Sequence, residues 1–137
     1  MLKYFFLLTR PINMFLCFVS VICGGILGDK PLLLMREFFT TLLTGELPSW
    51  SLRVLFGALS ASLILGAGNV FNDVCDVKCD RINAPYRPLP SGRVSQPSAT
   101  WFSFILACLG FLLSLQLGEQ GIIIALIAIV LLFLYDI

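Results

Sequence analysis

The sequence predicts an all-α protein whose helices cross a membrane side by side as a polytopic transmembrane helical bundle. Apolar residues make up 58% of the 137 residues and charged residues 12%, against about 45–50% and about 25% in soluble domains. The apolar residues form stretches close to the roughly 20 residues that one transmembrane helix needs. Clusters of proline and glycine separate the stretches. We therefore expect a membrane bundle with four spans.

The composition also excludes several kinds of site. The chain has no histidine, which removes Ser-His-Asp and Cys-His nucleophile arrangements and any histidine-ligated metal. A net charge of +1 without a basic stripe does not indicate nucleic-acid binding. An odd number of cysteines without a CxxC pair fits neither a disulfide framework nor a zinc site. We interpret them as small apolar residues of the helices: Cys17, Cys23, Cys75, Cys79 and Cys108.

The first span is expected over residues 11–28. Gly24 and Gly28 form a GxxxG pair, a pattern that lets two helices approach closely in a membrane. A cleaved signal peptide is the alternative, with Lys3 and Arg10 as its basic region. No small-x-small cleavage site ends the apolar stretch, so we favour a span that stays in the protein.

An amphipathic helix lying in the membrane interface is expected over 32–44, because its apolar residues recur at i, i+3 and i+4. Trp50 follows, at headgroup level. The second span is expected over 53–73. Its small residues recur every four positions and predict a face for close helix packing: Ala58, Ser62 and Gly66.

A polar loop rich in proline is expected over 74–97, then a third span over 99–117 and a tight turn at 118–121. The fourth span, over 121–137, is about 26 Å long at 1.5 Å per residue, shorter than the roughly 30 Å hydrocarbon core. We therefore expect the chain to be the N-terminal portion of a longer protein.

The basic residues predict the orientation, because cytoplasmic segments carry an excess of lysine and arginine. Two lie near the N-terminus and four in the 74–97 loop, whereas three lie on the opposite side. We expect an integral protein of the cytoplasmic membrane, with its N-terminus and this loop in the cytoplasm.

Acidic residues gather where the second span meets the loop. Asp73, Asp76 and Asp80 are spaced i, i+3 and i+7, and would share one face if the helix continued. Asn72 joins them. Aspartates are costly near a bilayer and usually mark function there. A divalent cation would offset their repulsion, and Mg²⁺ prefers oxygen ligands together with substrate phosphate.

Arginines follow directly on the proline-stiffened loop, at Arg81, Arg87 and Arg93. Guanidinium groups match phosphate oxygens in pairs. Carboxylates and arginines at a membrane face predict a metal–diphosphate site above an apolar tunnel, which a prenyl diphosphate would fill. The alternative is an ordinary solvated loop whose arginines follow from the topology alone.

The residues resemble a known family. The stretch Asn72-Asp73-x-x-Asp76-x-x-x-Asp80 looks like the first aspartate-rich motif, NDxxDxxxD, of the UbiA superfamily of intramembrane prenyltransferases. The following run, over 80–93, resembles that family's D-R-x-N-x-P-x-R-P-x-P-S-G-R sequence. Thr9-Arg10-Pro11-x-Asn13 is similar to the family's first helix. Within the superfamily, the sequence of these motifs is most similar to that of the digeranylgeranylglyceryl phosphate synthases.

The resemblance implies a bundle of about nine helices, of which this chain holds the first four. It implies Mg²⁺-dependent transfer of a prenyl group, for example from geranylgeranyl diphosphate, to a lipophilic acceptor such as a lipid glycerol phosphate or an aromatic quinone precursor. The implied catalytic residues are Asn72, Asp73, Asp76 and Asp80, with the three aspartates as metal ligands. Asn13 would line the cavity, and Arg81, Arg87 and Arg93 would bind the diphosphate or cap the loop. Cys75 and Cys79 occupy variable motif positions and are interpreted as packing residues.

Two other hypotheses remain open. A truncated, non-catalytic membrane protein could bind a lipid diphosphate without turning it over. A small transporter could use the acids as an ion path, although such acids usually lie near the midplane of the membrane rather than at a helix end. A second aspartate motif, which the family places near a later helix, does not occur in these 137 residues.

Overall fold

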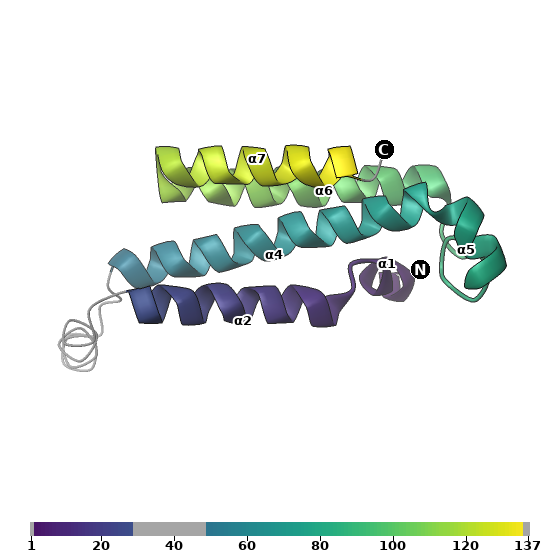
Figure 1. Cartoon of the computed structure of the whole chain (residues 1–137), viewed down its shortest axis with the longest axis horizontal. Coiled ribbons are helices and arrows are strands. Elements are labelled where there is room, and N and C mark those ends of the chain that lie inside the picture. Colours follow the sequence, from purple (N-terminus) through teal and green to yellow (C-terminus); the bar gives the residue numbers. More distant parts are fainter. Residues whose placement is uncertain (1, 29–48, 136–137) are drawn as a thin grey trace.

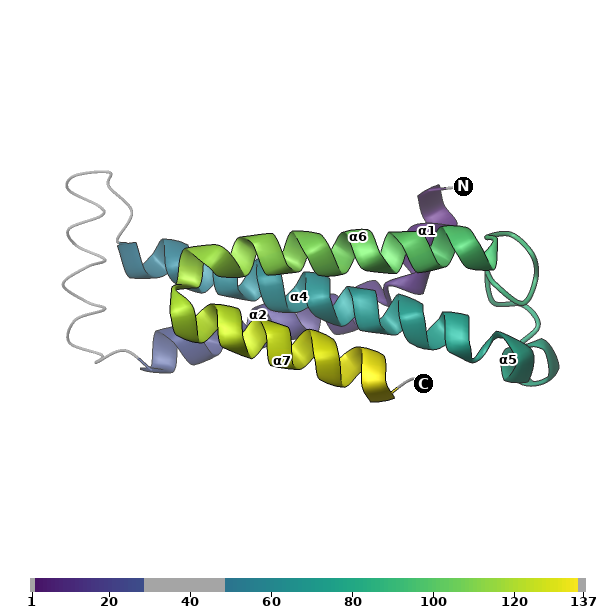
Figure 2. The same cartoon turned by 90° about the horizontal axis from the view of Figure 1, so that it is seen from above.

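The computed structural model describes residues 2–28 and 49–135, apart from the side chains of 49–51. Four long helices lie side by side: α2 (Pro11–Gly28), α4 (Ser49–Cys75), α6 (Gln96–Ser114) and α7 (Glu119–Tyr135) (Figure 1). Two short helices, α1 (Leu2–Leu8) and α5 (Val77–Asn83), gather with the 84–95 loop at one end (Figure 2). The N-terminal segment and the acidic segment therefore share an end of the bundle.

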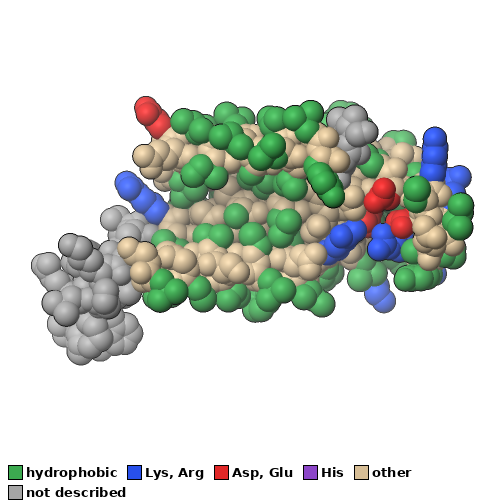
Figure 3. All heavy atoms as spheres, viewed as in Figure 1, with side chains coloured by type: hydrophobic (Ala, Val, Ile, Leu, Met, Phe, Trp, Pro, Cys, Tyr) green, Lys and Arg blue, Asp and Glu red, His purple; other side chains and the backbone are tan. Residues whose placement is uncertain are grey.

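The helices have the length and polarity of membrane spans. Among the described residues, three segments are long and apolar enough to cross a membrane, namely Pro11–Gly28, Leu52–Cys75 and Gln96–Leu117, and α7 is a shorter apolar helix of 17 residues. Apolar side chains cover the sides of the bundle, whereas charged side chains lie at its two ends (Figure 3). Within the described residues there is helix but no strand. The predicted all-α transmembrane bundle is confirmed.

The helix bounds differ from the sequence-based spans at several ends. α2 covers the expected residues 11–28, whereas α4 begins before and ends after the expected 53–73. α6 begins three residues early, because the Ser95 side chain accepts a hydrogen bond from the Ser98 N–H and Pro97 lies in the first turn, where its missing N–H costs nothing. The expected helix over 32–44 lies outside the described residues, as does the side chain of Trp50.

The segment expected as a loop over 74–97 contains α5, which sequence analysis did not predict. At the other end of α6, a short 3₁₀ helix (η1, Leu115–Leu117) leads to Gly118, whose φ of +81° turns the chain into α7. Glycine adopts such a positive φ without steric cost. The turn is thus tighter than the expected 118–121, because α7 already begins at Glu119.

α4 is the central helix, and small residues bring its neighbours close. A Cβ at Gly66 would lie 2.9 Å from the Met14 Sδ of α2, so this position faces α2. On the side facing α6, the Ser60 hydroxyl donates to the Gly110 carbonyl at 2.7 Å, and the Ser103 hydroxyl donates to the Ala67 carbonyl at 2.8 Å. Such interhelical hydrogen bonds and close backbone approaches stabilise helix pairs where no hydrophobic effect drives association.

The small-residue face predicted for the second span is buried: Ala58, Ser62 and Gly66. Within the described residues, no helix packs against the GxxxG pair of α2. A Cβ at Gly24 or Gly28 would meet none of the described atoms within 4 Å, whereas a Cβ at Gly25 would lie 2.6 Å from the Val54 side chain of α4. The contact face of α2 is rotated by one residue from the GxxxG pair, so the two glycines of the motif lie on the outer surface.

Candidate functional site

Asp73 lies in the last turn of α4 and is 6% exposed. Its Oδ1 accepts a hydrogen bond from Arg10 Nη2 at 2.7 Å, and the same nitrogen donates to Asn72 Oδ1 at 3.3 Å. Arg10 sits between α1 and α2 with a φ of +51°, a left-handed conformation that residues other than glycine rarely adopt. This backbone conformation turns the chain from α1 into α2, at the residue that also pairs with Asp73.

Asp80 lies on α5 and is 9% exposed. Arg87 Nη1 donates to Asp80 Oδ2 at 2.7 Å and lies 3.6 Å from Asp73 Oδ1. The hydrogen bond with Asp80 raises the pKa of Arg87 above its ordinary value. One guanidinium nitrogen therefore lies between two largely buried carboxylates, one from α4 and one from α5.

Asp76 is placed differently from the other two aspartates. It occupies the single residue between α4 and α5, as the N-cap of α5, and its side chain makes no capping hydrogen bond. Asp76 is exposed, whereas Asp73 and Asp80 are buried. The expectation that all three carboxylates share one face is not met, because the interruption at Asp76 breaks the regular helical spacing on which it depended.

Arginines neutralise the buried acids. The sequence predicted a divalent cation in this role. The donor types suit Mg²⁺, since two carboxylates and the amide oxygen of Asn72 are oxygen ligands. In this conformation, however, arginine binds the Asn72 amide oxygen and one oxygen of each carboxylate, and the described part of the chain brings together no group of three His, Cys, Asp or Glu side chains for a metal. The oxygen atoms of Asn72, Asp73 and Asp80 are of the type that Mg²⁺ binds. In this structure the guanidinium groups of the arginines set the distances between them.

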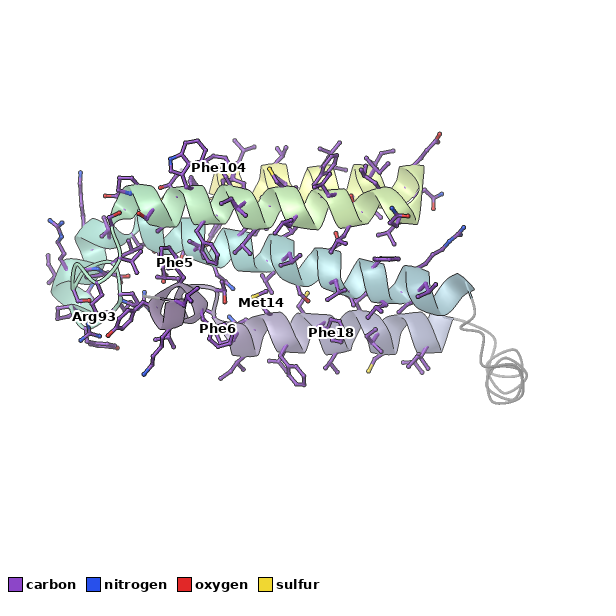
Figure 4. All side chains as sticks on the ribbon, turned by 180° about the vertical axis from the view of Figure 1, so that it is seen from behind. Phe5, Phe6, Met14, Phe18, Arg93 and Phe104 are labelled. Carbon is purple, nitrogen blue, oxygen red and sulfur yellow. The ribbon has the colours of Figure 1, made fainter. Side chains whose placement is uncertain are left out.

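The other predicted site residues lie around this core. Asn13, in the first turn of α2, and Arg81, on α5, are exposed. Arg93 is also exposed, with its guanidinium carbon 5.3 Å from the centre of the Tyr4 ring. Arg93 reaches from the loop towards α1 (Figure 4). This contact joins the loop to α1.

The N-terminal segment is tied to the acidic end at further points. The Asn69 side chain donates to the Thr9 carbonyl at 3.0 Å. Phe5 of α1 packs edge-on against Phe102 of α6, with ring centres 5.1 Å apart, and lies between these two helices in Figure 4. Neither Arg10 nor Asn69 was predicted to have a site role from the sequence. The signal for Arg10 was its place in the Thr9-Arg10-Pro11 run.

An apolar groove of about 480 Å³ lies between α4 and α7, with almost no polar surface in its lining. On α4 its nearest residue to the acids is Leu65, about 12 Å from Asp73 along a helix that rises 1.5 Å per residue. A second apolar groove, of about 450 Å³, lies between α6 and α7. The bundle therefore offers apolar grooves along its length and a charged cluster at its end.

The cysteines next to the acids do not pack in the core. Cys75 and Cys79 are both exposed within the described bundle, so their interpretation as packing residues stays a prediction. Cys75 ends α4 and Cys79 lies on α5, and Asp76 between them is also exposed. No group of metal-binding side chains in the described residues includes either of them.

Comparison with known proteins gives consistent matches. Residues 32–137 match the UbiA prenyltransferase family. The chain is 31% identical over 134 residues to digeranylgeranylglyceryl phosphate synthase of Methanosphaera stadtmanae, covering 94% of this chain and 41% of that protein. It is 34% identical over 134 residues to the synthase of Methanococcus aeolicus, covering 98% and 42%. Against the synthase of Sulfolobus acidocaldarius it is 45% identical over 89 residues, covering 64% and 32%.

A solved structure concerned with digeranylgeranylglyceryl phosphate synthase in membranes superposes with a TM-score of 0.79 at 33% identity, covering 98% of this chain and 43% of that one. The chain thus spans about two fifths of the length of the relatives that it matches from end to end. The match to the family model extends over the acidic motif and all of the described helices from α4 onwards. The fold, the motif and these matches together place this integral membrane chain in the UbiA prenyltransferase family.

Proposed function

We propose that this chain supplies the first aspartate-rich part of a site that transfers a prenyl group from a prenyl diphosphate to a lipophilic acceptor within the membrane. The observation that carries the proposal is the Asp73–Arg87–Asp80 cluster at the end of an apolar bundle. Buried carboxylates next to arginines suit a metal–diphosphate head, and apolar grooves suit its hydrocarbon tail. The relatives named as digeranylgeranylglyceryl phosphate synthases favour a lipid glycerol phosphate as the acceptor.

The reaction breaks the bond between C1 of the prenyl chain and the diphosphate oxygen. The electron pair of that bond leaves with the diphosphate, and C1 becomes an allylic cation. The acceptor oxygen attacks C1 and passes its proton to the released diphosphate. A bound Mg²⁺ would neutralise charge on the leaving diphosphate. Catalysis of this kind is electrostatic, because it stabilises the charge that develops on the leaving group.

The residues of this chain have distinct proposed roles. Asp73 and Asp80, with the amide oxygen of Asn72, would hold the ion. Arg87, which is 39% exposed at its side chain, would bind phosphate oxygens, because a guanidinium matches them with two parallel hydrogen bonds. The exposed positions of Asn13, Asp76, Arg81 and Arg93 leave them available to substrate or ion, as the family resemblance implies. The groove between α4 and α7 would take part of the prenyl chain.

The orientation proposed with this function puts the acidic end in the cytoplasm. Lys3, Arg10 and the arginines of the 84–95 loop lie at that end of the bundle, which follows the excess of basic residues on the cytoplasmic side. The diphosphate head of a prenyl diphosphate is charged and stays in water. With the acidic end at the cytoplasmic surface, the head group enters the site without its charge crossing the membrane.

The test uses the complete protein in nanodiscs, with radiolabelled geranylgeranyl diphosphate, Mg²⁺ and geranylgeranylglyceryl phosphate. We expect Asp80→Asn to lower transfer at least 100-fold, in line with losing one electrostatic contact in a transition state. Asp76→Asn is the comparison within the motif. Arg53→Gln is the matched control. Arg53 lies near the start of α4, at the end of the bundle opposite the acidic site, so this variant should leave the rate unchanged. Full activity of Asp80→Asn would refute the assignment.

The alternative of a non-catalytic diphosphate-binding protein makes a different prediction in the same assay. The wild-type protein would then bind the labelled diphosphate with no product at any acceptor concentration. Retention of label on the nanodiscs, measured beside product formation, separates the two functions.

A further inference from the structure

We propose that Arg10 and Arg87 are exchangeable counter-ions of the acidic site. In the resting protein they neutralise Asp73 and Asp80, and when a diphosphate enters with a divalent cation they leave the carboxylates and bind phosphate oxygens. This inference rests on the proposed function, and it adds a substrate-binding role for Arg10, to which the sequence pattern gave no site role.

The two arginines occupy one oxygen of each buried carboxylate, an oxygen that a cation could otherwise use. Arg10 Nη2 lies 2.7 Å from Asp73 Oδ1, and Arg87 Nη1 lies 2.7 Å from Asp80 Oδ2 and 3.6 Å from Asp73 Oδ1. A carboxylate oxygen that accepts a charge-assisted hydrogen bond at this distance cannot also ligate Mg²⁺ from the same direction. Cation and guanidinium therefore compete for the buried aspartates.

The carboxylates are buried, whereas the arginines are partly exposed. The side chains of Asp73 and Asp80 are 9% and 12% exposed, whereas those of Arg10 and Arg87 are 38% and 39% exposed. A buried carboxylate that stays ionised needs a cationic partner. The long, half-exposed arginine side chains can swing to the rim of the site without unpacking the bundle, so the exchange requires only that another cation takes their place.

Arg10 links the exchange to the N-terminal segment. Arg10 holds its left-handed backbone conformation where α1 meets α2, and its carbonyl accepts hydrogen bonds from the N–H groups of Asn13 and Met14. Its side chain ties this junction to Asp73 and Asn72 of α4. Arg93 over Tyr4 joins the loop to α1 in addition. Release of Arg10 from Asp73 would therefore loosen α1 over the acidic end when substrate enters.

The test measures binding of Mn²⁺, as a spectroscopic substitute for Mg²⁺, to the complete protein in nanodiscs by electron paramagnetic resonance. Each variant is titrated alone and with geranylgeranyl thiolodiphosphate, an analogue whose C1–S bond resists ionisation. The variants are Arg10→Gln and Arg87→Gln, with Arg53→Gln as the matched control at the other end of α4. Arg87→Lys, which keeps the charge, serves as the conservative variant.

Exchange predicts a reversal of sign between the two conditions. Without the analogue, Arg10→Gln and Arg87→Gln bind Mn²⁺ more tightly than wild type, by about tenfold, because the competing cation is gone. With the analogue they bind it more weakly, by about tenfold, because the phosphate loses a partner; both are within the usual range of coupling between two sites. Arg87→Lys lies between wild type and Arg87→Gln in each condition.

The outcomes separate the exchange from the proposed function. A purely structural role would leave Mn²⁺ affinity unchanged or lowered in both conditions, and that result would overturn the exchange alone. If the glutamine variants do not fold, the same reversal at smaller size in Arg87→Lys and its Arg10→Lys counterpart supports the exchange, and its absence overturns it. Wild-type protein that binds no Mn²⁺ even with the analogue would overturn the proposed function itself.

Discussion

Three glycines of the bundle allow a graded test of how closely its helices pack. A Cβ at Gly110 would lie 2.7 Å from Ile64 Cγ1, 3.0 Å from the Ser60 carbonyl oxygen and 3.2 Å from the Ile64 backbone nitrogen. A Cβ at Gly66 would lie 2.9 Å from the Met14 Sδ, a flexible side chain, and a Cβ at Gly24 would meet nothing within 4 Å. The three sites thus differ in what the added methyl group would meet.

The magnitudes follow from two opposing effects. Alanine is favoured over glycine inside a helix by about 0.5–1 kcal/mol. Overpacking costs about 1–3 kcal/mol where neighbours cannot move. Gly24→Ala should therefore raise the free energy of unfolding by about 0.5 kcal/mol, and Gly66→Ala should leave it within about 0.5 kcal/mol of wild type, since Met14 can change rotamer. Gly110→Ala should lower it by about 1–2 kcal/mol, because two of its neighbours are backbone atoms of α4.

The assay is reversible unfolding of the complete protein in mixed micelles, followed by intrinsic fluorescence, with each alanine variant compared with wild type. The order Gly24→Ala, Gly66→Ala, Gly110→Ala, from most to least stable, is the expected result. Equal stability of Gly24→Ala and Gly110→Ala would refute the close contact between α4 and α6. A Gly24→Ala variant that unfolds most easily would instead show that the GxxxG face of α2 is a packing face.

Further expectations concern the polar contacts and the groove. A double-mutant cycle of Arg87→Met with Asp80→Asn should give a coupling energy of about 1–2 kcal/mol in thermal unfolding, between the values for exposed and buried ion pairs, and a coupling under about 0.3 kcal/mol would mean that the pair is not formed. Ser103→Ala, which removes the hydrogen bond to the Ala67 carbonyl, should cost about 0.6 kcal/mol, the average for interhelical hydrogen bonds in a membrane, whereas Ser91→Ala, on the exposed loop, should cost less. Ala61→Phe places a ring in the groove between α4 and α7. It should shift the ratio of transfer rates for a 20-carbon over a 10-carbon prenyl diphosphate at least threefold towards the shorter substrate. An unchanged ratio would show that the groove does not hold the prenyl chain.

The transmembrane bundle was predictable because the signals for it are local. Length of apolar stretch and clusters of proline located α2, α4, α6 and α7 to within a few residues. The small-residue face of α4 was predictable for the same reason, since a four-residue spacing lies on one side of any helix. The face of α2 that contacts α4 was not predictable. A GxxxG pair indicates that a helix can approach closely, but it does not say on which side of α2 the helix α4 lies.

The start of α6 and the existence of α5 show how local signals can mislead. Proline was taken to end helices, yet Pro97 lies in the first turn of α6 and Ser95 caps it. The helix α5 has seven residues and follows α4 after the single residue Asp76. A helix this short carries no periodic pattern of apolar residues long enough to detect in the sequence.

The acidic site was predictable in part. The sequence pattern singled out Asp73, Asp80 and Arg87, which the structure brings together. It did not indicate that Arg10, sixty-three residues before Asp73, would be the second partner, because such pairing is set by how α1 and α4 pack. The prediction that Asp76 shares a helix face with Asp73 and Asp80 depended on an unbroken helix. The interruption between α4 and α5 changes the direction of the Asp76 side chain relative to the other two.

The most direct test of the central claim is a cryo-EM structure of the complete protein with Mg²⁺ and geranylgeranyl thiolodiphosphate. We expect the diphosphate at the end of the bundle formed by α1, α5 and the 84–95 loop, with Asp80 on the metal and Arg87 on a phosphate oxygen. A diphosphate bound elsewhere, with Arg87 still paired to Asp80 as in the present structure, would contradict the account.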